Sequence, residues 1–207
     1  MSMAQRERQA LVVAMSEAGP DAPTLCGAWT VRDLAAHLIV RERRPDAAPG
    51  ILLKPFAGYL ESVQERVACK PFPELLELVR TGPPWWSPLK PVDAMVNLSE
   101  MFVHHEDVRR AGPDWAPREL AESDEAKLWG VASKVGKMAY RKSPVPVVLA
   151  TPDGRRAEVK SADGAAVTLT GKPSELVLHA FGRENVRIET AGEPEAVRAV
   201  LELDRSF

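Results

Sequence analysis

Residues 92–112 read VDAMVNLSEMFVHHEDVRRAG, and the pattern of this stretch decides the fold of the first part of the chain. At 100° per residue, one stripe of the expected helix falls within about 80° of arc. That stripe comprises Val92, Val96, Glu100, Val103 and Asp107, with His104 at its edge. Most of the remaining surface is apolar and is covered by Met95, Leu98, Met101 and Phe102. A helix that is apolar nearly all round is buried, so we expect residues 92–111 to lie inside a helical bundle.

A second decisive stretch, WTVRDLAAHLIVRERR at residues 29–44, carries the clearest helix-start signal in the chain. Thr30 suits the N-cap, Asp33 follows at capping-box spacing, and Trp29 can pack against Leu34 as a hydrophobic staple. This helix should run to about residue 44, because the following Pro45 disfavours helical geometry before it. Similar periodicity predicts helices over 4–18, 51–67, 73–80 and 123–141.

From residue 143 onward, short alternating apolar runs separated by Pro and Gly replace the helical texture. Strands are expected over 145–150 and 156–160, on either side of the turn Thr151-Pro-Asp-Gly-Arg. A third strand over 165–170, a helix over 173–181, a strand over 186–190 and a helix over 194–203 complete a β-β-β-α-β-α order. The sequence therefore predicts an α+β protein with a helical domain at 1–142 and a small α+β domain at 143–207.

Glu100 and His104 are the first candidates for a chemical site. Their i, i+4 spacing places both side chains on one helix face, and a buried carboxylate needs a partner. His37, on the inner side of the helix over residues 30–44, is the candidate third ligand. Three protein ligands with open positions are typical of a catalytic metal site. The alternatives are a satisfied core histidine at His37 and an ordinary helix-surface contact between Glu100 and His104.

The other candidate residues have plainer interpretations. Asp107 lies one turn from His104 and is either a carboxylate that orients this imidazole or a surface charge. We interpret His105 as solvated or packed, and His179 as packed. Cys26 and Cys69 show no metal or redox spacing, so reduced thiols without a disulfide are expected.

Composition excludes several classes of function. The 207 residues carry a formal net charge of −2 and are 45% apolar, which gives no electrostatic footprint for nucleic acid or an anionic membrane. No window approaches the roughly 18 apolar residues of a membrane span, and the first residues lack the pattern of a secretion signal. We expect a cytoplasmic protein, and a homodimer remains an open alternative.

Residues 24–50, TLCGAWTVRDLAAHLIVRERRPDAAPG, together with EMFVHHEDVRRAG at 100–112, resemble the DinB-like, mycothiol-dependent maleylpyruvate isomerase superfamily. The tail, from TPDGRRAEVK to AGEPEAV, resembles the sterol-carrier-like C-terminal domain of that family. The resemblance implies an up-down four-helix bundle in which His37, Glu100 and His104 bind a divalent metal.

The resemblance also implies a chemistry. Zinc is the first expectation for the metal, with nickel or iron as alternatives. Mycothiol would be the thiol cofactor, and the partner a small electrophilic substrate that undergoes thiol transfer or isomerisation. If the protein is such an enzyme, Arg41, Arg44, Arg109 and Arg183 are candidates for holding carboxylates, and the alternative for each is a surface charge or a helix-end cation. The alternative is a non-catalytic, metal-stabilised binding or regulatory protein, with Asp107 or Cys26 as a fourth ligand.

Overall fold

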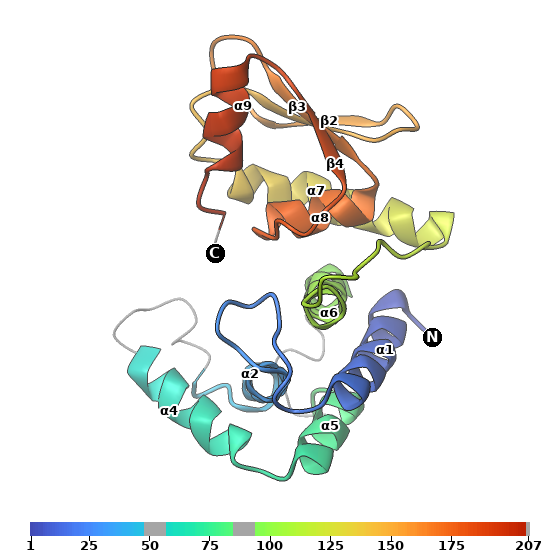
Figure 1. Ribbon diagram of the computed structural model, residues 1–207, viewed down its shortest axis with the longest axis vertical. Helices are drawn as coiled ribbons and strands as arrows, with labels where there is room; N and C mark the ends of the chain where they lie inside the picture. The colour runs from blue at the N-terminus through green and yellow to red at the C-terminus, as the bar shows by residue number, and fades with distance from the viewer. Residues whose placement is uncertain (48–56, 85–93, 206–207) are drawn as a thin grey trace. The chain divides into compact units, whose positions relative to one another are not determined.

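The computed structural model describes residues 1–47, 57–84 and 94–205 (Figure 1). The regular elements described in the first part of the chain are helices, and a four-stranded sheet with further helices follows, so the predicted α+β class is confirmed. Two compact units, Met1–Trp115 and Ala116–Phe207, divide the chain. This division falls before the helix α7 (Glu122–Ala139), whereas the sequence places the boundary after residue 142. That 1–142 and 143–207 are separate folding domains stays a prediction.

The first unit contains α1 (Met3–Ala18), α2 (Val31–Arg43), α4 (Ala57–Ala68), α5 (Phe72–Thr81) and α6 (Ala94–Arg109). Each overlaps a helix expected from sequence; the expected residues 51–56 and 92–93 lie outside the described residues. Helix α1 packs on α6 and α5, and α2 packs on α4 and α5. Leu34 and Leu38 of α2 and Met101 of α6 belong to one buried cluster, so the core lies between the helices that carry the candidate ligands.

The start of α2 follows its sequence signal. Asp33 N donates to Thr30 Oγ1 at 3.3 Å, and Thr30 N donates to Asp33 Oδ2 at 2.9 Å, which completes the capping box. Trp29 packs against the cluster that contains Leu34. Such caps contribute about 1 kcal/mol. Because the cap fixes where α2 begins, it also fixes the direction in which His37 points two turns later.

Three charged contacts hold α2 against its neighbours. Arg8 of α1 pairs with Glu42 and also donates to Val79 O of α5 at 2.8 Å. Arg43 donates to backbone carbonyls at the end of α5, and Arg32 donates to backbone carbonyls that follow α4. The ion pair and these cationic hydrogen bonds therefore position α2 on three sides.

In the second unit, the sheet has the order β2-β1-β3-β4. Its strands are β1 (Val147–Ala150), β2 (Arg156–Lys160), β3 (Val167–Gly171) and β4 (Ile188–Ala191). The β1–β3 pair is parallel and the other two pairs are antiparallel. The helices α8 (Pro173–Ala180) and α9 (Pro194–Leu201) complete the predicted β-β-β-α-β-α order. The predicted turn joins β1 to β2, and Gly154 adopts φ +90° there.

Helix α7 belongs to this second unit because it packs on α8 and β2. At Gly136 the approach is so close that an added Cβ would lie 2.9 Å from Val159 Cγ1. The sequence pattern of a helix cannot show on which side of a domain boundary it packs, so this placement required the structure.

A buried polar pair in the second unit leads to a pH prediction. The hydroxyl of Tyr140 lies 2.6 Å from Nδ1 of His179, and both residues are buried. Burial, and then the charge of Arg205, lower the pKa of His179 to about 3. In the unfolded chain this pKa is about 6.5. Stability that is present at pH 7 is therefore lost as the pH falls from about 6.5 towards 3, because only the unfolded chain then takes up the proton.

Urea unfolding of the parent and the His179→Leu variant at pH 7 and pH 5 tests this expectation. The parent should lose about 2 kcal/mol more than the variant between the two pH values. An equal loss in both proteins would show that His179 is protonated in the folded state as readily as in the unfolded one.

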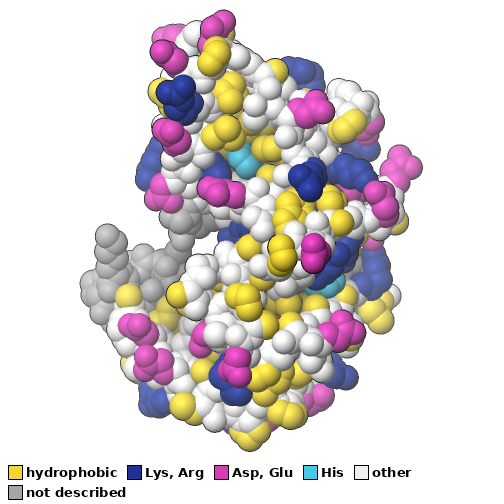
Figure 2. Space-filling model, in the orientation of Figure 1, with side chains coloured by type: hydrophobic (Ala, Val, Ile, Leu, Met, Phe, Trp, Pro, Cys, Tyr) yellow, Lys and Arg dark blue, Asp and Glu magenta, His cyan; other side chains and the backbone are white. Residues whose placement is uncertain are grey.

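The described surface has two further features. On the face shown in Figure 2, Lys and Arg side chains alternate with Asp and Glu, and neither sign forms a continuous patch. Among the described residues, none of the helices has the length and apolarity needed to cross a membrane.

Candidate metal centre

Helices α2 and α6 bring His37, Glu100 and His104 together, as the sequence predicts for a common site. Nε2 of His37 lies 3.4 Å from Glu100 Oε1, and Nε2 of His104 lies 3.3 Å from the same oxygen. All three ligand atoms lie within 4.8 Å of one another. The side chains keep 18%, 19% and 12% of their surface exposed, in the order His37, Glu100 and His104. The cluster is therefore mostly buried, and part of each side chain stays exposed.

The separations distinguish a ligand set from a hydrogen-bonded group. Bonds of about 2.0–2.2 Å at tetrahedral angles place neighbouring N and O ligands about 3.4 Å apart. An ordinary N–H···O hydrogen bond is shorter, about 2.9–3.0 Å. The two N···O separations of 3.3 and 3.4 Å match the ligand geometry. The two separations from Glu100 therefore fit a tetrahedral divalent ion, and the two imidazole nitrogens lie within 4.8 Å of each other.

The electrostatics of the cluster keep its carboxylate charged. Burial by itself raises the pKa of Glu100, but the polar contacts of His104 and His37 and the charge of Arg41 outweigh burial. They hold that pKa well below its usual range. An ionised carboxylate is the form that binds a cation, so Glu100 is ready to act as a ligand at neutral pH.

The second ring nitrogen of His104 has its own partner. Nδ1 lies 2.8 Å from Asp107 Oδ2, one turn further along α6, and Asp107 is completely buried. Burial lowers the pKa of His104, but its contacts with Asp107, Cys26 and Glu100 outweigh burial and hold this pKa well above its usual range. The carboxylate keeps a proton on Nδ1, and a metal at Nε2 would take the place of the proton on that nitrogen. Asp107 therefore orients this imidazole, and the interpretation as a surface charge is wrong.

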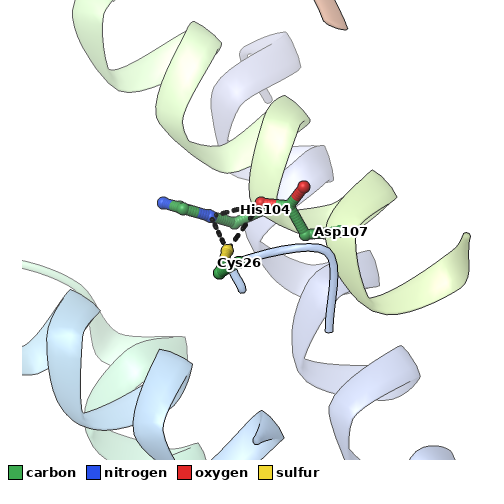
Figure 3. Close-up of side chains that lie close together, drawn as sticks. All are labelled: Cys26, His104 and Asp107. Carbon is green, nitrogen blue, oxygen red and sulfur yellow. Dashed lines mark hydrogen bonds and ion pairs between the residues drawn. The ribbon is translucent and has the colours of Figure 1, made fainter. Parts of the chain in front are cut away.

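Cys26 lies on the same side of the His104 ring as Asp107 (Figure 3). Its thiol donates to Asp107 Oδ2 at 3.0 Å, and Sγ lies 3.6 Å from His104 Nδ1. Both partners meet the same ring nitrogen, so the three residues lack the arrangement of a nucleophile, base and orienting carboxylate. The sequence did not predict the Cys26–Asp107 bond, because the two residues are 81 positions apart and no motif links them.

The four candidate arginines differ in their distance from the ligand set and in their partners. Arg41 Nε lies 3.4 Å from Glu100 Oε1, whereas Arg44 pairs with Asp46 and Arg109 pairs with Glu106. Arg183, in the other unit, donates to Phe181 O. Nη1 of Arg41 is buried and donates to nothing in the described part of the chain. Of the four candidates, Arg41 is thus the one whose positive charge lies beside the ligand set.

The histidines and the cysteine outside the two clusters are His105, His179 and Cys69. His105 is buried with Nδ1 2.8 Å from Glu7 Oε2, so it is packed and not solvated. The packed interpretation of His179 is confirmed. Neither Cys26 nor Cys69, both in the described part of the chain, forms a disulfide, and Cys69 is exposed.

A cavity of about 470 Å³ lies between α2 and α4, and none of the three candidate ligands lines it. Its lining includes Trp29, whose ring centroid lies 5.0 Å from that of His37. The other lining residues come from α2 and α4, and they are Asp33, Ala57, Leu60, Glu61, Gln64 and Glu65. The cavity volume is within the range of small-molecule sites. The sequence predicts a role for Trp29 only at the helix start, because its contact with His37 is tertiary.

A helical unit with a two-histidine, one-carboxylate cluster thus defines a candidate metalloprotein. Residues 3–50 match the family described as Mycothiol maleylpyruvate isomerase N-terminal domain, in agreement with the resemblance seen in the sequence. The matched segment contains His37 but neither Glu100 nor His104. No curated protein and no solved structure gives a significant match to the chain.

The Asp107–His104 contact leads to a prediction about metal affinity. Replacing Asp107 by Asn should weaken binding of zinc about 10- to 100-fold, because the imidazole loses the charged acceptor that orients it. Competition with a chromophoric chelator measures the affinity, and Asp114→Asn, an exposed change in the same unit, is the control. If Asp107→Asn bound zinc as tightly as the parent, Asp107 would have no role in the metal centre.

Proposed function

We propose that this protein is a divalent-metal enzyme in which His37, Glu100 and His104 hold the ion and leave coordination positions open. The observation that supports this most is the match between the two N···O separations and tetrahedral ligand geometry. Zinc is the first candidate, and nickel or iron also suits two imidazoles and a carboxylate.

The substrates follow from the open side of the cluster and from the family that matches residues 3–50. We propose a low-molecular-weight thiol, mycothiol, as the cofactor and a small electrophile as the substrate of thiol transfer or isomerisation. A thiol bound to the ion loses its proton and becomes a nucleophile at neutral pH.

The residues of this chain contribute binding and orientation. The partly exposed edges of His37 and Glu100 leave room for an incoming group. Arg41 places a positive charge beside Glu100, which favours an anionic ligand such as a thiolate or a carboxylate. Asp107 holds the ring of His104 in one orientation.

Cobalt substitution tests the proposal. The Cys26→Ser/Cys69→Ser double variant is loaded with one equivalent of cobalt, so that no cysteine thiolate of the chain contributes to the spectrum. Addition of a small thiol should then produce a thiolate-to-cobalt charge-transfer band, and thiol transfer to a small electrophile should require the metal. Metal binding without any thiol band would instead support the alternative, a non-catalytic metal-stabilised binding or regulatory protein.

Two properties remain proposals that this experiment does not address. A cytoplasmic location is expected from the sequence pattern and is tested by fractionation of cells that express the tagged chain. A homodimer is the alternative to a monomer, and sedimentation equilibrium distinguishes the two states.

A further inference from the structure

We propose that Cys26, Asp107 and Nδ1 of His104 form a second metal-binding set, which takes thiophilic ions and competes with the His37–Glu100–His104 set. The three ligand atoms, Cys26 Sγ, His104 Nδ1 and Asp107 Oδ2, lie within 4.8 Å of one another (Figure 3). This set extends beyond the proposed function because it faces the opposite nitrogen of His104 and includes a sulfur.

The backbone around Cys26 holds its sulfur in place over α6. Leu25 N donates to the backbone oxygen of Asp107 at 3.1 Å, and Cys26 N donates to Thr24 Oγ1 at 3.1 Å. Thr24 Oγ1 in turn donates to Trp29 O at 2.8 Å. The loop between α1 and α2 is therefore attached to α6 beside Asp107. A prearranged ligand loses little conformational freedom when an ion binds.

The ligand chemistry favours a soft or borderline ion. Thiolate sulfur selects thiophilic metals, and imidazole and carboxylate are common partners of such sulfur in zinc sites. Sγ and Nδ1 are 3.6 Å apart, close to the roughly 3.5 Å expected between S and N ligands of a tetrahedral ion. Asp107 Oδ2 lies nearer, at 2.8 Å from Nδ1 and 3.0 Å from Sγ. Its carboxylate must move about 0.5 Å to reach ligand separations.

Proton balance is simple for this second set. His104 starts with a proton on each ring nitrogen, so binding of a divalent ion releases one proton from Sγ of Cys26 and one from Nδ1 of His104 to solvent, while Nε2 keeps its proton. Asp107 contributes its charge without losing a proton. The hydrogen bonds that Asp107 Oδ2 now makes with both neighbours are replaced by bonds to the ion.

Competition follows from the shared imidazole. The Nε2 atom of His104 serves the first set and Nδ1 serves the second. An ion at one nitrogen repels a cation at the other, and occupation of both nitrogens requires loss of both ring protons. Linkage then demands that each ion weaken the other by the same factor. A hard or borderline ion at Nε2 and a thiophilic ion at Nδ1 are thus mutually exclusive at low metal concentration.

Cadmium is the probe, because sulfur-to-cadmium charge transfer gives an ultraviolet absorption that reports thiolate binding. The parent protein should show this absorption at one equivalent. Cys26→Ser should abolish it, whereas Cys69→Ser, which removes the exposed cysteine, should leave it unchanged. His37→Gln should also retain it, since His37 belongs only to the first set. Prior loading with one equivalent of zinc should weaken cadmium binding at least tenfold in the parent.

Each other result overturns the second set. Charge transfer that survives in Cys26→Ser would place cadmium elsewhere. Its loss in a folded His37→Gln variant, checked by circular dichroism, would make Cys26 a fourth ligand of the first set. Failure of the proposed function gives a different result. If His37→Gln bound cobalt as tightly as the parent, the first set would be disproved, whereas the cadmium measurements on the second set would be unaffected.

Discussion

Replacing His37 by glutamine is expected to lower zinc affinity by more than about 100-fold, beyond the 10- to 100-fold loss that an outer partner causes. Without this imidazole, the ion would keep only Glu100 and His104, two ligands from one turn of α6. Isothermal titration at neutral pH, with zinc delivered from a weak chelator, measures the change. His104→Gln should have the same effect, because Nε2 of His104 lies as close to Glu100 as Nε2 of His37 does.

His105→Gln is the matched control for this prediction. His105 neighbours His104 in the sequence, but it is buried against Glu7 of α1 and makes no contact with the ligand set in the described residues. Zinc affinity should therefore stay within about twofold of the parent, less than 0.5 kcal/mol. If His37→Gln and His105→Gln bound zinc equally well, the metal centre would be disproved, whatever their effects on stability.

Local signals in the sequence predicted much of the first unit. The capping box at Thr30 fixed the start of α2, and the all-round apolar pattern of residues 92–112 placed α6 in a core. These signals act over three or four residues, so they depend little on tertiary contacts. The i, i+4 spacing brought Glu100 and His104 together for the same reason. The approach of His37 to Glu100 and His104 depends on how α2 packs against α6, so no local signal in the sequence could establish it.

The surroundings of the ligands were less predictable. Arg41 and Arg44 lie three positions apart on one basic stretch, yet Arg41 faces Glu100 and Arg44 pairs with exposed Asp46. Composition cannot separate two such residues, because the choice depends on which neighbour each finds in space. The same holds for Cys26, whose bond to Asp107 joins a loop to a helix 81 positions away.

Glu42→Ala is expected to destabilise the first unit by about 3–5 kcal/mol, the cost of leaving a buried charge without its partner. Glu42 is 2% exposed and pairs with Arg8, whose side chain is 11% exposed. Arg8 would keep its hydrogen bond to Val79 O, which satisfies one donor but does not neutralise the charge. Urea unfolding followed by tryptophan fluorescence measures the loss.

Two comparisons separate this charge effect from a simple loss of packing. Glu74→Ala breaks an exposed pair with Lys70 and should cost about 0–1 kcal/mol. The double variant Arg8→Met/Glu42→Met removes both charges and keeps side-chain volume, so it should recover most of the stability lost in Glu42→Ala. A double variant as unstable as Glu42→Ala would mean that the pair itself stabilises the fold. Recovery would mean that α2 and its His37 depend on the neutralisation of Arg8, and that apolar packing between α1 and α2 can replace the ion pair.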